Sequence, residues 1–149
     1  MGLRERLDED LKAALRAKDQ RRLAVIRGVK AAILAEETKG TRTSLDDDGI
    51  VGVLSKEIKQ RRDAIPDFRR GNRPDLVEQA EAEIAILEEY LPAPLSPAEL
   101  EALVEEAVAE TGASGPRDMG KVMGWLRPRT RGRADGKAVA DLVKARLGG

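Results

Sequence analysis

PDLVEQAEAEIAILEEYLPAPLSPAELEALVEEAVAET, residues 74–111, contains two helical patterns separated by a short break. In the first pattern apolar residues recur three and four positions apart, which is the period of an amphipathic helix. The two prolines of LPAPL, residues 91–95, disfavour helix. Ser96 and Glu99 then form a capping box, with Pro97 at the first turn of the next helix. We therefore predict helices at about 74–91 and 97–111, with a domain boundary between them.

Upstream of this stretch, three further helices are predicted. Leucines recur every fourth residue in the first of them, so their side chains should face inward. These leucines are Leu3, Leu7, Leu11 and Leu15. Asp19 should cap a second helix that ends near Thr38, and Ser44 with Asp47 forms an approximate capping box for a third. Pro66 should kink this third helix or end it early, because proline lacks a backbone N–H and clashes with the preceding turn.

Downstream, a short helix carrying residues 119–126 should stop before Pro128, residues 127–133 should form a loop, and a last helix should follow Asp135. Good helix formers dominate the composition, and the chain has one Trp, one Tyr and one Phe, which argues against sheets. The predicted fold is all-α, with an N-terminal helical domain at 1–93 and a small C-terminal helical domain at 94–149.

The chain contains neither cysteine nor histidine. This excludes disulfides, thiolate metal sites, a cysteine nucleophile and the usual general base. The run Asp46-Asp47-Asp48 lacks the spacing of a calcium loop, and acidic residues are common at helix starts. No Gly-rich phosphate loop of the Walker type is present. We therefore predict no catalytic residue, no metal and no cofactor.

The formal net charge of zero conceals a segregation of charge along the chain. Residues 1–73 carry 18 basic and 13 acidic side chains, residues 74–113 carry 11 acidic and no basic ones, and residues 114–149 carry 9 basic and 3 acidic ones. A polyanionic partner is therefore compatible with the charge distribution, although the net charge alone argues against one. The acidic segment is interpreted as solvated helix faces, or as a surface that pairs with basic residues of this chain or of a partner.

The densest chemical signal is WLRPRTRGRADGK, residues 125–137. In an extended loop its alternating arginines would point the same way and present a row of guanidiniums to a phosphate backbone. Two helix starts, each with a glycine and a lysine, would offer N–H groups to anions. The predicted RNA-binding residues are Lys121, Arg127, Arg129, Arg131, Gly132, Arg133, Gly136 and Lys137. The alternative is a solvated loop in which Asp135 merely caps a helix. In either case Trp125 is interpreted as a residue of the core.

A second basic cluster is interpreted as the polar end of a helix, where cations are favourable. Its members are Arg61, Arg62, Arg69, Arg70 and Arg73.

Several separated motifs resemble the YqeY family. DMGKVM at 118–123 followed by GRADGK at 132–137 is similar to the family's tail signature. The opening at 3–30, EIKQRR at 57–62 and ILEEYLP at 86–92 are similar to other parts of the family. The sequence departs from the family pattern at Pro66 and in its Arg-richer loop.

The resemblance implies an all-helical protein whose small C-terminal domain is similar to the tail of GatB, a subunit of the glutamine-dependent tRNA amidotransferase, a carbon–nitrogen ligase. That tail helps to hold tRNA, while catalysis resides elsewhere. The matching positions are Gly120, Lys121, Gly132, Ala134 and Lys137. The implied partners are tRNA or another structured RNA, and an amidotransferase or aminoacyl-tRNA synthetase.

Two functional hypotheses follow. The first is a non-catalytic tRNA-binding module; the alternative is a protein–protein adaptor that acts through the acidic helices without contacting RNA. An amide-forming enzyme is disfavoured because the usual catalytic residues are missing. No apolar run approaches the roughly 20 residues that span a bilayer, and no charged segment leads into an apolar one. We therefore expect a cytoplasmic protein without membrane contact.

Overall fold

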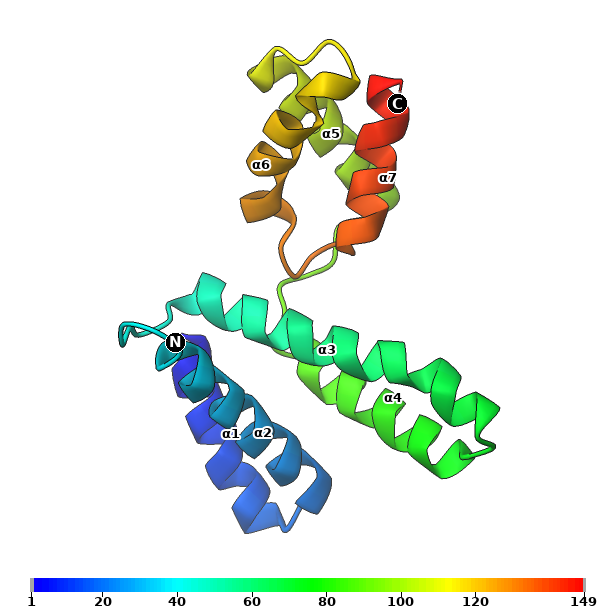
Figure 1. Ribbon diagram of the computed structural model, residues 1–149. Coiled ribbons are helices and arrows are strands. Elements are labelled where there is room, and N and C mark those ends of the chain that lie inside the picture. Colours follow the sequence, from blue (N-terminus) through cyan, green and yellow to red (C-terminus); the bar gives the residue numbers. More distant parts are fainter. Residues whose placement is uncertain (1, 149) are drawn as a thin grey trace. The chain divides into compact units, whose positions relative to one another are not determined.

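The computed structural model describes residues 2–148, and every regular element in that range is a helix, which confirms the all-α prediction. The elements are α1 Leu3–Ala17, α2 Gln20–Glu37, α3 Asp47–Arg70, α4 Pro74–Glu88, α5 Pro97–Thr111, the 3-10 turn η1 Pro116–Asp118, α6 Met119–Thr130 and α7 Gly136–Leu147 (Figure 1). The chain forms two compact units, one ending at Leu91 and one beginning at Pro92. This division lies two residues from the boundary predicted after residue 93.

The N-terminal unit consists of two helical hairpins, α1–α2 and α3–α4 (Figure 1). They share one apolar core because α2 packs on both α3 and α4. The core residues with almost no exposed surface are Leu7, Ile26, Val29, Ile50, Leu54 and Leu87. Burial of such side chains contributes about 1.5–3 kcal/mol each to folding.

Tyr90 joins α1 to the end of α4. Its ring is buried, its hydroxyl donates a hydrogen bond to Asp10, and the Arg6 guanidinium lies 4.9 Å from the ring centroid. Burial raises the pKa of the Tyr90 phenol, as does the neighbouring Asp10 carboxylate. Arg22 adds a two-pronged ion pair to Glu89, with both N–O distances 3.0 Å. The hairpins are thus tied together by polar contacts as well as by the core.

The C-terminal unit packs α5, α6 and α7 around a smaller core. Its buried residues are Leu100, Val104, Ala107, Val108, Val122, Leu126, Val139, Val143 and Leu147. The predicted capping box is confirmed: Ser96 accepts from the Glu99 N–H at 3.1 Å, and Glu99 accepts from the Ser96 N–H at 3.0 Å. Gly112 ends α5 with a φ of 68°, a left-handed conformation that favours glycine.

Two details of the N-terminal unit correct the predictions. Of the two effects predicted for Pro66, the early end of the helix is wrong: α3 continues to Arg70, because Ile65 and Phe68 on either side of the proline pack against the core. Its start is capped by Asp46, whose carboxylate accepts from the Gly49 N–H at 2.9 Å, and not by Ser44.

The predicted inward leucine stripe of α1 is wrong at its last position. Leu15 is 50% exposed, whereas Leu3 and Leu7 are buried. A strict spacing of four residues drifts around a helix of 3.6 residues per turn, so the fourth leucine leaves the core face. In the described range, no helix is long and apolar enough to cross a membrane.

Candidate nucleic-acid interface

The basic segment of the C-terminal unit is mostly helical, which corrects the predicted loop at 127–133. The α6 helix does not stop before Pro128 but runs on to Thr130. Thr130 is buried, and its hydroxyl donates to the Leu126 carbonyl at 3.1 Å, so packing of the last turn offsets the N–H that Pro128 lacks. The predicted row of guanidiniums along an extended chain is therefore wrong for Arg127 and Arg129. The predicted α7 start is confirmed, because Asp135 caps it.

Arg129 is held against its own helix. Its guanidinium carbon lies 3.7 Å from the centroid of the Trp125 ring, and its Nη1 donates to the Trp125 carbonyl at 2.6 Å. Trp125 is itself half-buried and packs against the C-terminal core. One face of the indole is thus covered by a cation, an arrangement worth about 0.5–1 kcal/mol at exposed sites.

Arg133 holds the turn between α6 and α7 against the start of the C-terminal unit. Its Nε donates to the Ala93 carbonyl at 2.9 Å, and its own carbonyl accepts from the Leu95 N–H at 2.8 Å. Gly132 precedes it with a φ of 73°, a conformation in which a β-carbon would be strained. Arg133 and Gly132 therefore fix the shape of the turn. No local pattern in the sequence signals the contact to Ala93, which is 40 residues away.

Three predicted cations of this segment remain free. The side chains of Arg127, Arg131 and Lys137 are exposed and have no hydrogen-bond or ion-pair partner within residues 2–148. Arg127 and Arg131 are four residues apart, at the end of α6 and at its cap, so they share one side of the helix. Lys137 lies in the first turn of α7, directly after the turn.

Both helix starts already carry a carboxylate. Asp135 accepts from the Ala138 N–H at 3.2 Å and so occupies the N-terminus of α7 beside Gly136. At the start of α6, Lys121 lies 3.7 Å from Asp118. The Ser114 N–H and Lys121 both lower the pKa of Asp118, which keeps this carboxylate ionised. An incoming phosphate would meet these negative charges, so the free side chains are better anion ligands than the helix ends.

Six of the eleven acidic side chains of segment 74–113 form ion pairs with arginines of the same unit. The ion pairs are Asp75–Arg73, Glu78–Arg21, Glu81–Arg69, Glu83–Arg61, Glu89–Arg22 and Glu105–Arg146. In the second basic cluster Arg70 also pairs with Asp67, and only Arg62 is without a partner in the described range. The interpretation of that cluster as a polar helix end is therefore consistent with the contacts.

The aspartate run at the start of α3 has structural roles. Asp46 caps the helix, and Asp47 accepts from the Leu3 N–H at 3.1 Å, which joins α1 to α3. Within residues 2–148, no group of three acidic side chains is placed to hold a metal ion.

Comparisons with known proteins give a match over nearly the whole chain. The model of the family described as Yqey-like protein matches residues 4–147. A protein of Lachancea thermotolerans is 36% identical over 147 residues, covering 95% of this chain and 76% of that protein. A protein of Pyrenophora tritici-repentis is 32% identical over 147 residues, covering 96% of this chain and 80% of that protein. Both are named "Altered inheritance of mitochondria protein 41, mitochondrial".

The names of these relatives contradict the cytoplasmic prediction, which is wrong. The prediction relied on the lack of an apolar leader segment. Mitochondrial targeting segments are amphipathic and Arg-rich instead, so a search for apolar segments does not bear on that compartment.

Proposed function

The chain belongs to the Yqey-like protein family, and from that premise we propose that it is a non-catalytic module that binds tRNA or another structured RNA through the α6–α7 turn. By its similarity to the GatB tail, the module would work beside an amidotransferase or an aminoacyl-tRNA synthetase. The C-terminal unit would hold the RNA, and the N-terminal unit would dock the protein partner.

The observation that carries this proposal is the set of free cations at the turn. Arg127, Arg131 and Lys137 are exposed and unpaired in the described range, whereas most arginines of the N-terminal unit form ion pairs. Unpaired guanidiniums bind phosphate oxygens with two parallel hydrogen bonds. Arg129 and Arg133 are positioning residues in this proposal, because their guanidiniums already contact Trp125 and Ala93.

The same geometry favours phosphate contacts over reading of bases at this turn. The covered face of Trp125 is not free to stack on a base. Contacts to phosphates fix the position of a nucleic acid without reading its sequence. The turn should therefore bind structured RNAs of different sequence with similar affinity.

The test is the affinity for a fluorescently labelled tRNA, measured by anisotropy on the full chain. The variant combines Arg127→Ala, Arg131→Ala and Lys137→Ala. Hydrogen bonds to charged groups contribute about 1.5–3 kcal/mol each, so loss of all three should lower the affinity by at least about a thousandfold.

The matched control removes the same amount of charge elsewhere. It combines Arg69→Ala, Arg70→Ala and Arg73→Ala, three arginines of exposed ion pairs in the N-terminal unit. Such pairs contribute about 0–1 kcal/mol to stability, so the control should fold and should keep most of its RNA affinity. Equal losses in the two variants would refute the assignment of the turn.

The adaptor hypothesis is a second candidate function, with the α5 helix as the surface that binds the protein partner. Glu101, Glu106 and Glu110 are exposed and have no partner in the described range, unlike the paired acids of α4. If a protein partner survives nuclease treatment and is lost when these three glutamates are changed to lysine, the adaptor function is favoured.

A further inference from the structure

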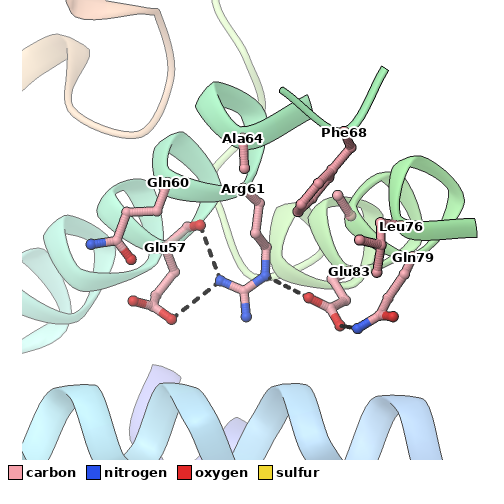
Figure 2. Close-up of a pocket in the computed structure, with 9 residues that line it drawn as sticks. Glu57, Gln60, Arg61, Ala64, Phe68, Leu76, Gln79 and Glu83 are labelled. Atoms are coloured by element: carbon pink, nitrogen blue, oxygen red, sulfur yellow. Dashed lines mark hydrogen bonds and ion pairs between the residues drawn. The ribbon is translucent and has the colours of Figure 1, made fainter. Parts of the chain in front are cut away.

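A pocket of about 380 Å³ lies between α3 and α4 of the N-terminal unit (Figure 2). It shares no residue with the α6–α7 turn. Its lining residues are Glu57, Gln60, Arg61, Ala64, Phe68, Leu76, Gln79, Ala80 and Glu83. The lining combines apolar side chains, among them one aromatic ring, with three charged side chains and two side-chain amides.

Two carboxylates hold the Arg61 guanidinium in the wall of the pocket. Its Nε donates to Glu83 at 2.9 Å, and its Nη1 donates to the Glu57 carboxylate at 3.2 Å and to the Glu57 carbonyl at 3.1 Å. Gln79 donates to the second oxygen of Glu83 at 3.1 Å. The three charged side chains are only 18–22% exposed, so their positions are well defined by the helices.

This network leaves hydrogen-bonding capacity unused beside the pocket. The two N–H groups of Arg61 Nη2 have no acceptor within residues 2–148, and the second carboxylate oxygen of Glu57 has no donor there. Figure 2 shows this nitrogen between the side chains of Glu57 and Glu83. A ligand that matches this pattern offers an acceptor to the guanidinium and a hydrogen-bond donor to the carboxylate.

The remaining wall fits a flat ring. Phe68 and Leu76 lie on the opposite side of Arg61 from Glu57 (Figure 2), and the small residues Ala64 and Ala80 leave space beside them. Unpaired bases of RNA are commonly stacked on aromatic side chains and held by hydrogen bonds along one edge.

We propose that this pocket binds an unpaired guanine base. Guanine is the RNA base that places an acceptor, O6, beside two adjacent donors, N1–H and N2–H, along one edge. O6 accepts from Arg61, while the two N–H groups donate to Glu57. The triad of one guanidinium and two carboxylates carries one excess negative charge, which repels phosphate and selects the neutral base. The choice of a nucleobase rests on the proposed RNA binding, whereas the donor and acceptor pattern does not.

The test is a titration followed by nuclear magnetic resonance. Nucleosides, which lack phosphate, are added to the full chain labelled with nitrogen-15. Guanosine at roughly millimolar concentration should shift the resonances of the Arg61 Nε–H and of the Gln60 and Gln79 side-chain amides. Inosine lacks the 2-amino group and should bind about tenfold more weakly. Adenosine, cytidine and uridine should bind more weakly than guanosine. The inference is overturned if guanosine moves none of these signals, or if all the nucleosides bind alike.

Protein variants locate the interaction. Phe68→Leu removes the stacking ring, and Glu57→Gln removes the carboxylate with little change of shape; each should weaken guanosine binding about fivefold or more. The control Arg62→Lys alters an exposed neighbour outside the pocket lining and should bind guanosine like the parent. Unchanged binding in both pocket variants overturns the inference.

The two proposals fail independently. The triple variant at Arg127, Arg131 and Lys137 should keep guanosine binding while it loses tRNA. If the chain binds tRNA through the turn but gives no guanosine signal, only the proposal for the pocket is refuted.

Discussion

Replacing Leu126 with alanine is expected to lower the melting temperature of the C-terminal unit and to leave that of the N-terminal unit unchanged. Leu126 is fully buried at the centre of the C-terminal core, and its carbonyl accepts the hydroxyl of Thr130 in the last turn of α6. The substitution therefore loosens the core and the helix end that carries the proposed RNA contacts.

The size of the effect follows from burial. Replacing a buried leucine with alanine costs about 2–5 kcal/mol, because a cavity is added to the lost transfer free energy. A unit that starts at Pro92 is stable by only about 3–9 kcal/mol at typical stabilities per residue. Leu126→Ala should lower its melting temperature by at least roughly 10 °C.

The assay is thermal unfolding followed by far-UV circular dichroism, with nuclear magnetic resonance of both units at a temperature between the two transitions. The chain offers a control with the same chemical change, because Leu15 is 50% exposed. Leu15→Ala should change the unfolding free energy by less than about 1 kcal/mol.

The reasoning is refuted by either of two results. If Leu126→Ala is no more destabilising than Leu15→Ala, the burial argument is wrong. If signals of the two units disappear together at one temperature, the units do not fold independently.

Two further predictions concern the N-terminal unit. Tyr90→Phe removes a buried hydroxyl that donates to Asp10, so the free energy of unfolding in urea should fall by about 1.5–3 kcal/mol. The pKa of Glu37 lies below its ordinary value of 4.5, because the carboxylate accepts from the Leu45 N–H at 2.8 Å and from Arg4 at 2.6 Å. A lowered folded-state pKa stabilises the protein above 4.5, and this stabilisation is lost as the pH falls through the folded-state pKa. Glu37→Gln should therefore weaken the pH dependence of the urea midpoint below 4.5, and an unchanged dependence would contradict this assignment.

Local signals in the sequence predict much of the fold. Asp19, Ser96 and Asp135 cap helices as expected, and Gly112 ends α5. Each of these signals depends on hydrogen bonds between residues a few positions apart. Such contacts form in the same way wherever the helix is placed.

The errors arise where tertiary packing overrides local preference. Pro66 and Pro128 each remove one backbone hydrogen bond, which predicts a kink or an early end at Pro66 and a helix end before Pro128. Both helices continue because neighbouring side chains, such as Ile65 and Thr130, are buried and hold the next turn in place. The sequence does not show which side chains will be buried beyond a proline.

The sequence predicts which residues belong to the candidate interface but not the contacts that each of them makes. The sequence pointed to a basic segment, but it could not separate the free cations from those with structural contacts. Arg133 binds Ala93, and Arg22 binds Glu89, at sequence distances of 40 and 67 residues. The Glu57–Arg61 pair of the pocket has a local i,i+4 signal, whereas Glu83 comes from another helix.

The salt dependence of tRNA binding tests the central claim most directly. Each phosphate contact releases counterions and adds about 0.7–0.9 to the slope of log affinity against log salt concentration. If Arg127, Arg131 and Lys137 each contact a phosphate, replacing all three with alanine should reduce that slope by about 2–3 relative to the parent chain. An identical slope in the parent and the triple variant would contradict the claim that this turn binds RNA.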